Sequence, residues 1–157
     1  MRITSEDRGT AIEMIPNDPD DDYSGYTFRA VVKNEFNPFS GQNDGVHFSA
    51  FDLFLKRLAE FIQTREGGAL VEMTEDCRLE FFRWNAKGDV GIRAQITKYE
   101  FSTNSTRKPK TSLIVEFQVD GEFVNQLYEN FKTEGGLLRR CWSTAGPFSF
   151  RSRRGRV

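Results

Sequence analysis

The chain is poor in the residues that most often perform catalysis or bind metals. Its 157 residues include one histidine, His47, and two cysteines, Cys77 and Cys141, which lie far apart. A zinc site made of protein ligands needs several such groups at workable spacing, so the sequence does not favour one. Phosphate-binding glycine loops and the GxSxG nucleophile motif are also missing. We therefore expect no metal, no cofactor and no enzymatic activity.

Long apolar runs are missing too. No stretch approaches the ~20 apolar residues that a membrane-spanning helix needs. Residues 1–7 lack the apolar stretch of a secretory signal. These features predict a cytoplasmic protein that does not enter a membrane, with Cys77 and Cys141 as free thiols in a reducing compartment.

His47 leaves one catalytic alternative open. A histidine that acts as a general base needs a nucleophile or an orienting carboxylate beside it, and Asp44 is near along the chain. A histidine in a loop before a helix is the other interpretation of the same residue. A hydrolase that uses His47 is therefore one function class to test.

Apolar and aromatic residues, in contrast, are plentiful. Hydrophobic residues make up 38% of the chain, and fifteen are phenylalanine, which indicates an aromatic core. The length is that of one domain with a substantial core. We expect a single domain over residues 1–147 and a basic C-terminal tail over residues 148–157.

Periodicity predicts the secondary structure. Apolar residues at every second position indicate strands near residues 11–15, 26–32, 69–73, 77–82, 90–97 and 112–119. Helical spacing indicates amphipathic helices near 51–62 and 123–131, with Ser49 and Asp120 as caps. Loops are predicted at 36–45 and 102–110, and Gly135 and Gly136 are predicted to end the second helix.

These elements predict an α+β fold. Strands joined by short turns pair antiparallel, and one-sided alternation indicates one buried sheet face. Two helices with apolar stripes are the natural cover for that face. We expect two layers, an antiparallel sheet of about six strands with both helices on one face.

Charge is unevenly distributed along the chain. The net charge is −1, but residues 139–157 carry six arginines and no acid, so the remaining residues carry −7. Four acids, Asp18, Asp20, Asp21 and Asp22, form one cluster in a predicted loop, and Glu75 with Asp76 forms another in a predicted turn. Such acids can be ordinary solvated turns, catalytic carboxylates or a docking patch for a basic protein. We name these six as the candidate partner-binding residues.

Three segments resemble a known family. They are 39–41 with the helix 51–58, then 68–72 running into 77–81 and 88–92, and finally 113–120 leading into the helix that holds Phe123 and Leu127. Together they resemble the WapI-like immunity proteins of bacterial polymorphic-toxin systems, over residues 26–131. The resemblance implies a cytoplasmic, cofactor-free protein that binds a cognate toxin domain and blocks its active site.

A module of another class is the alternative. The open sheet face, with Arg29, Arg93 and the arginine tail, could bind a small ligand or RNA. The acidic body does not favour nucleic acid, because it would repel a phosphate backbone. The oligomeric state is not predicted.

Overall fold

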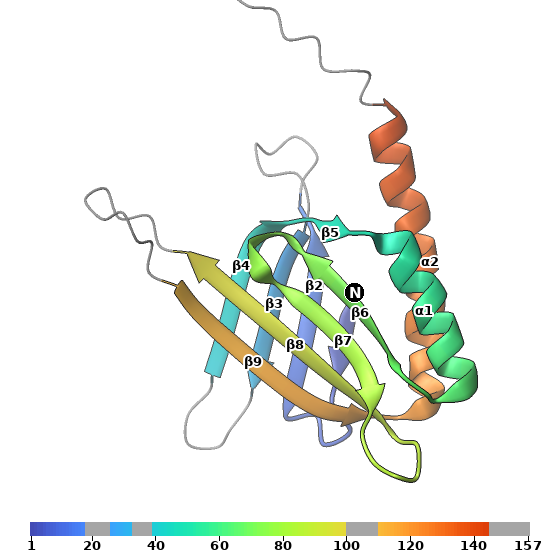
Figure 1. The fold of residues 1–157 in the computed structure, drawn as a ribbon. Helices are drawn as coiled ribbons and strands as arrows, with labels where there is room; N and C mark the ends of the chain where they lie inside the picture. Colours follow the sequence, from blue (N-terminus) through green and yellow to red (C-terminus); the bar gives the residue numbers. More distant parts are fainter. Residues whose placement is uncertain (18–25, 33–38, 100–109, 145–157) are drawn as a thin grey trace, which may run out of the picture.

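The computed structural model describes residues 1–17, 26–32, 39–99 and 110–144, and it contains two antiparallel sheets and two α-helices (Figure 1). The first sheet has the order β1-β2-β3-β4, with strands β1 (Arg2–Thr4), β2 (Thr10–Pro16), β3 (Tyr26–Val32) and β4 (Phe39–Val46). The second has the order β5-β6-β7-β8-β9, with strands β5 (Phe48–Ser49), β6 (Gly68–Met73), β7 (Arg78–Arg83), β8 (Val90–Tyr99) and β9 (Lys110–Val119). The helices are α1 (Phe51–Thr64) and α2 (Gly121–Thr144), and a 3-10 turn, η1 (Thr74–Asp76), joins β6 to β7.

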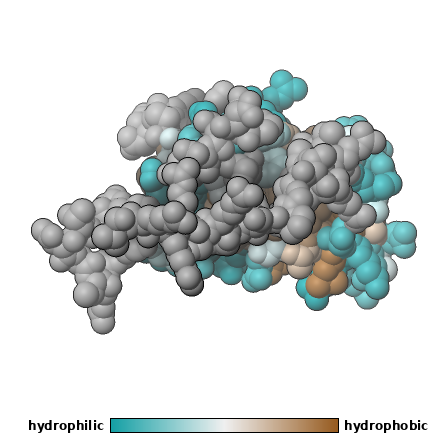
Figure 2. Space-filling model, turned by 90° about the horizontal axis from the view of Figure 1, so that it is seen from above, coloured by the Kyte–Doolittle hydropathy of each residue, from teal (hydrophilic) through white to brown (hydrophobic). Residues whose placement is uncertain are grey.

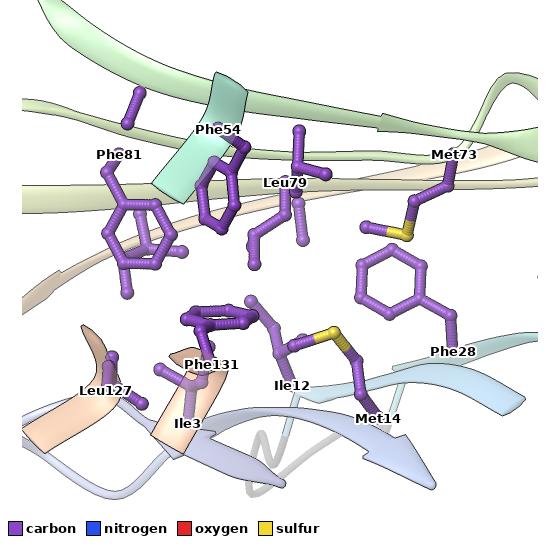
Figure 3. Close-up of a cluster of buried hydrophobic side chains, with 14 of the residues drawn as sticks. Ile3, Ile12, Met14, Phe28, Phe54, Met73, Leu79, Phe81, Leu127 and Phe131 are labelled. Carbon is purple, nitrogen blue, oxygen red and sulfur yellow. The ribbon is translucent and has the colours of Figure 1, made fainter. Parts of the chain in front are cut away.

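The two sheets bury their inner faces against each other and against the helices. In Figure 1 the five-stranded sheet lies in front of the four-stranded sheet, and α1 and α2 lie side by side at the β6 side of the sandwich. The largest buried side chains come from both sheets and both helices, among them Ile12, Phe28, Phe54, Phe81 and Phe131. Figure 3 shows these side chains meeting in one cluster, which confirms the predicted aromatic core.

The strands alternate between a buried inner face and a more exposed outer face. In β8, Ile92, Ala94 and Ile96 are buried, whereas Arg93 and Gln95 between them are only partly buried. Seen from above, the coloured surface of the molecule is mostly hydrophilic, with a small hydrophobic area (Figure 2). This one-sided pattern fits antiparallel sheets that are covered on one face.

The α+β class is confirmed, but the prediction of one sheet of about six strands was wrong. Among the described residues, nine strands form two sheets, and each sheet covers the other's buried face. The strands β1 and β5 have three and two residues, too few to show a period. The strand β4, predicted as loop, contains Gly41 and Gly45 and pairs only with β3 at the sheet edge, where polar residues are tolerated.

The helix ends were predicted with mixed success. Asp120 caps α2 as expected, because its Oδ1 accepts the Glu122 N–H at 2.8 Å. The prediction for Ser49 was wrong: Ser49 is in β5, and α1 starts after Ala50, which has a φ of 48° and makes no side-chain cap. Gly135 and Gly136 do not end α2, which continues to Thr144. A glycine inside a helix costs only about 1 kcal/mol, and the next four residues, Leu-Leu-Arg-Arg, favour helix.

Candidate partner-binding surface

The outer face of the five-stranded sheet is the most distinctive surface among the described residues. It points toward the viewer in Figure 1, and neither helix crosses it. Strand pairing places Glu80, Arg93 and Glu116 in one row across β7, β8 and β9, because Glu80 pairs with Arg93 and Arg93 with Glu116. In the neighbouring row, Phe82 pairs with Gly91.

Two aromatic side chains lie over the bare backbone of Gly91. A methyl group at Gly91 would lie 2.6 Å from both Phe82 Cζ and Trp84 Cε3, which is too close for contact. The two rings have centroids 5.8 Å apart and are tilted by 38°. Trp84 is 40% exposed. Glycine in a strand often marks such a close approach, and here it leaves room for both rings.

Arg93 completes this cluster. Its Cζ lies 5.1 Å from the Phe82 ring centroid, its Nη1 donates to Glu80 Oε2 at 2.9 Å, and its Nε donates to Glu116 Oε1 at 2.5 Å. The hydrogen bond with Glu116 is the main cause that raises the pKa of Arg93 above its ordinary value. The guanidinium is therefore fixed in position while about a third of its side chain stays exposed. We call Phe82, Trp84, Gly91 and Arg93 the aromatic–arginine cluster.

Of this cluster, sequence reasoning identified only Arg93 as a candidate. The available signal was position: Phe82 falls on an outward position of β7, whose inward positions hold Leu79 and Phe81, and Trp84 follows two residues later. Arg29, predicted together with Arg93 as part of a ligand- or RNA-binding face, lies instead on the outer face of the other sheet. Its Nη1 is 3.8 Å from Glu13 Oε2. The structure therefore does not bring Arg29 and Arg93 together.

The predicted acidic sites lie in different places. Asp18, Asp20, Asp21 and Asp22 fall outside the described residues. Glu75 and Asp76 form the predicted turn between β6 and β7, and both have left-handed backbones, with φ of 61° and 56°. Left-handed backbone is uncommon for side chains other than glycine and costs conformational energy, so this turn is held by its surroundings.

Asp76 is engaged within the protein. Its Oδ2 accepts a hydrogen bond from Lys110 Nζ at 2.8 Å and another from the Tyr99 hydroxyl. The Lys110 bond, followed by the Tyr99 bond, lowers the pKa of Asp76 below its ordinary value. No ion pair to Glu75 is found among the described residues. Of the two predicted contacts, Glu75 is therefore the one with its charge available.

Asp76→Asn is expected to remove a stabilising interaction that depends on pH. A carboxyl with a lowered folded pKa stabilises the fold above its unfolded pKa, and this contribution disappears as the pH falls through the folded value. The variant should therefore be less stable than the wild type at neutral pH and equal to it in strong acid, as urea denaturation along an acid series can measure. Glu75→Gln, which removes a charge from the same turn, is the control. A difference that stays constant with pH would contradict the assignment.

His47 lies between β4 and β5, in a loop before α1 as one interpretation predicted. Its backbone oxygen accepts the Thr74 N–H at 2.9 Å, and its N–H donates to Thr74 Oγ1 at 3.0 Å. Asp44, the suggested orienting carboxylate, accepts from Thr27 and Gln42 instead. The proposed His47–Asp44 pair is not seen among these hydrogen bonds.

Cys77 is buried, which raises the pKa of its thiol.

Wider comparisons and searches add no further candidate site. A scan of family models and searches of curated proteins and of solved structures gave no match. Within the described ranges, no three His, Cys, Asp or Glu side chains are grouped as metal ligands. No described helix has the length and apolar character needed to cross a membrane.

Proposed function

We propose that this chain is a cytoplasmic immunity protein that binds a cognate bacterial toxin domain and blocks its active site. The outer face of the five-stranded sheet would make the contact. The observation that carries this proposal is the aromatic–arginine cluster, which brings the partly exposed side chains of Phe82, Trp84 and Arg93 together on a sheet face that neither helix covers.

The composition of the cluster supports binding to a protein. Tryptophan and arginine are enriched among the residues that contribute most to protein–protein affinity. Arg93 is already fixed by Glu80 and Glu116, so little side-chain entropy remains to be lost on binding. Phe82, Gly91 and Arg93 are on strands, which hold side chains more rigidly than a loop does. Trp84 directly follows β7, and its N–H donates to the Asp89 carbonyl oxygen at 2.7 Å.

The charge of the chain supports the nature of the partner. Outside the arginine-rich residues 139–157 the net charge is −7. A basic toxin, such as a nuclease whose own surface attracts phosphate, would be drawn to this body at low salt. Glu75, and Asp18 with Asp20, Asp21 and Asp22, remain the proposed acidic contacts.

The alternative function requires the same aromatic rings to stack on RNA bases. Two carboxylates, on Glu80 and Glu116, pair with Arg93 and place negative charge where a phosphate would lie. The local charge therefore favours a protein partner over RNA.

The test is binding to the C-terminal domain of the large secreted protein that the proposal expects to be encoded next to this chain. We expect a salt-sensitive complex by calorimetry and an affinity at least about 30-fold weaker for Trp84→Ala, as expected of a residue worth about 2 kcal/mol at an interface. Ile15→Ala is the matched control, because Ile15 is 47% exposed on the outer face of the other sheet.

Three results would contradict the proposal. These are no complex at low salt, a complex indifferent to Trp84→Ala, or a gel shift with single-stranded RNA that the same substitution abolishes. The last result would favour the RNA-binding alternative.

A further inference from the structure

The β9 strand is an unusually open sheet edge. It is the last strand of its sheet, and ten consecutive residues pair with β8 without a bulge. Within the described part of the chain, no backbone hydrogen bond outside that pairing involves residues 110–119. Natural edge strands are usually short, bulged, interrupted by proline or covered, because free N–H and C=O groups attract another strand. The strand β9 is long, unbulged and free of proline, and no other described strand pairs along its outer edge.

An exposed apolar side chain lies in the middle of this edge strand. Ile114 is 54% exposed on the outer face, with Ser112 on one side of it and Glu116 on the other along that face. Lys110 and Glu116 are the charged side chains in the strand. Lys110 already pairs with Asp76 and Glu116 with Arg93, but their side chains stay 44% and 41% exposed. A partner strand can therefore still contact both charges and the apolar side chain between them.

A strand of the other sheet extends beneath the space beside the β9 edge. The strand β4 crosses beneath the five-stranded sheet, because Asn43 contacts β8 at Thr97 and Gly41 contacts β9 at Leu113. Two residues further toward its start, Phe39 continues the same direction and is 60% exposed. Figure 1 shows the beginning of β4 extending past β9. A strand added beside β9 would therefore lie over Phe39.

The position of β4 and Phe39 beneath this space limits what can pair with β9. A second copy of the chain that paired through its own β9 would bring its own β4 beneath that strand. The two β4 strands would then meet in one layer, where Phe39 already projects. A single extended segment has no second layer and fits without this conflict.

We infer that an extended segment of a partner protein adds to β9 as an antiparallel strand, between Ile114 on the outer face and Phe39 beneath. Antiparallel addition continues the pairing of the sheet and supplies main-chain hydrogen bonds for affinity. Charge complementarity places a basic residue opposite Glu116, an apolar residue opposite Ile114 and an acidic residue opposite Lys110. The inference deepens the proposed function and rests on it in one respect, that the segment belongs to the toxin domain.

The probe is a heptapeptide, Lys-Thr-Ile-Val-Thr-Val-Glu, written in the antiparallel register that sets its lysine opposite Glu116. The peptide Glu-Thr-Ile-Val-Thr-Val-Lys has the same composition and reversed charges. In NMR titrations of the full chain we expect shifts and slowed amide exchange confined to residues 110–119 and β4. The reversed peptide should bind at least about tenfold more weakly.

Two substitutions test the contacts on the protein side. Ile114→Lys places a lysine at the middle of the edge, a device that natural edges use against pairing. Phe39→Ala removes the aromatic side chain that would lie beneath the added strand. Each should weaken peptide binding at least about tenfold, whereas Ile15→Lys and Leu53→Ala, at residues with 47% and 48% exposure, should leave it unchanged.

The outcomes separate this inference from the proposed function. Peptide shifts on other strands, or binding that ignores Ile114→Lys and Phe39→Ala, would overturn the inference even if the toxin domain binds through Trp84. Peptide addition at β9 without toxin binding would uphold the edge and reject the proposed function. A wild-type dimer that Ile114→Lys makes monomeric would show that the occupant is a second copy, which also overturns the inference.

Discussion

Phe131→Ala should lower the free energy of unfolding by about 3–5 kcal/mol, the range measured for truncating a buried phenylalanine. The Phe131 side chain is completely buried, and its ring centroid lies 5.1 Å from that of Phe54 and 6.2 Å from that of Phe81. These contacts join α2 to α1 and to β7 (Figure 3). The loss combines buried apolar area, edge-to-face ring contacts and a cavity at the point where three elements meet.

Urea denaturation provides the measurement, with the loss calculated from the midpoint at an unchanged slope. Leu53→Ala is the control: Leu53 is on α1 but 48% exposed, and its loss should stay within about 1 kcal/mol. If Phe131→Ala does not fold, Phe131→Leu, which keeps most of the volume, should fold with a smaller loss. A loss below about 1 kcal/mol for Phe131→Ala would show that the helices do not close the core as described.

Sequence periodicity predicted the strands that have one clearly buried face. The β7 and β8 strands were correctly predicted because Leu79 and Phe81, and then Ile92 and Ala94, alternate with polar residues. The same pattern contains no information about what covers the buried face. Two helices or a second sheet satisfy it equally well, so the second sheet was missed.

Edge strands were harder to predict than central ones. The β4 strand has only two buried residues, Val46 and the polar Asn43, so its sequence shows no apolar alternation. Its Gly41 looked like a loop residue, yet a methyl group there would lie 2.8 Å from Leu113 Cδ2. A glycine needed for close approach between layers has the same sequence signature as a glycine in a turn.

The candidate site depended on register, which the sequence does not supply. The row of Glu80, Arg93 and Glu116 exists because β8 pairs with both β7 and β9. The short turn at Asn85 fixes the first pairing, and Asn85 Oδ1 accepts the N–H groups of Lys87 and Asp89 there. The second pairing follows a connection of ten residues between β8 and β9, a length that fixes no register.

Asn43 links the two sheets through a small buried polar network. Its Nδ2 donates to the Thr97 carbonyl oxygen at 2.5 Å and lies 3.8 Å from Cys77 Sγ. The Thr97 N–H donates to the same sulfur at 3.4 Å. The pairing of β8 with β7 ends at Gln95, which pairs with Arg78. At Thr97, the side chains of Asn43 and Cys77 therefore take the place of β7 as partners of the backbone C=O and N–H groups.

Asn43→Asp is expected to destabilise the protein by about 3–5 kcal/mol at neutral pH, comparable to leaving a buried charge unpaired. The substitution keeps the shape of the side chain but replaces an amide donor with a carboxylate oxygen, which then faces the Thr97 carbonyl. Burial raises the pKa of the introduced carboxyl in the folded state. The folded state therefore holds its proton to higher pH than the unfolded state does. The loss should be smallest below the ordinary carboxyl pKa and should grow as the pH rises toward the folded pKa.

The pH dependence distinguishes a buried charge from a simple packing defect. Asn125→Asp, the same chemical change at an exposed position of α2, should change stability by only about 0.5 kcal/mol. Urea midpoints for both variants along a pH series from acid to neutral provide the measurement. A loss in Asn43→Asp that did not change with pH would mean that the carboxylate reaches water. The hydrogen bond between Asn43 and Thr97 would then not be the buried link that holds β4 against β8.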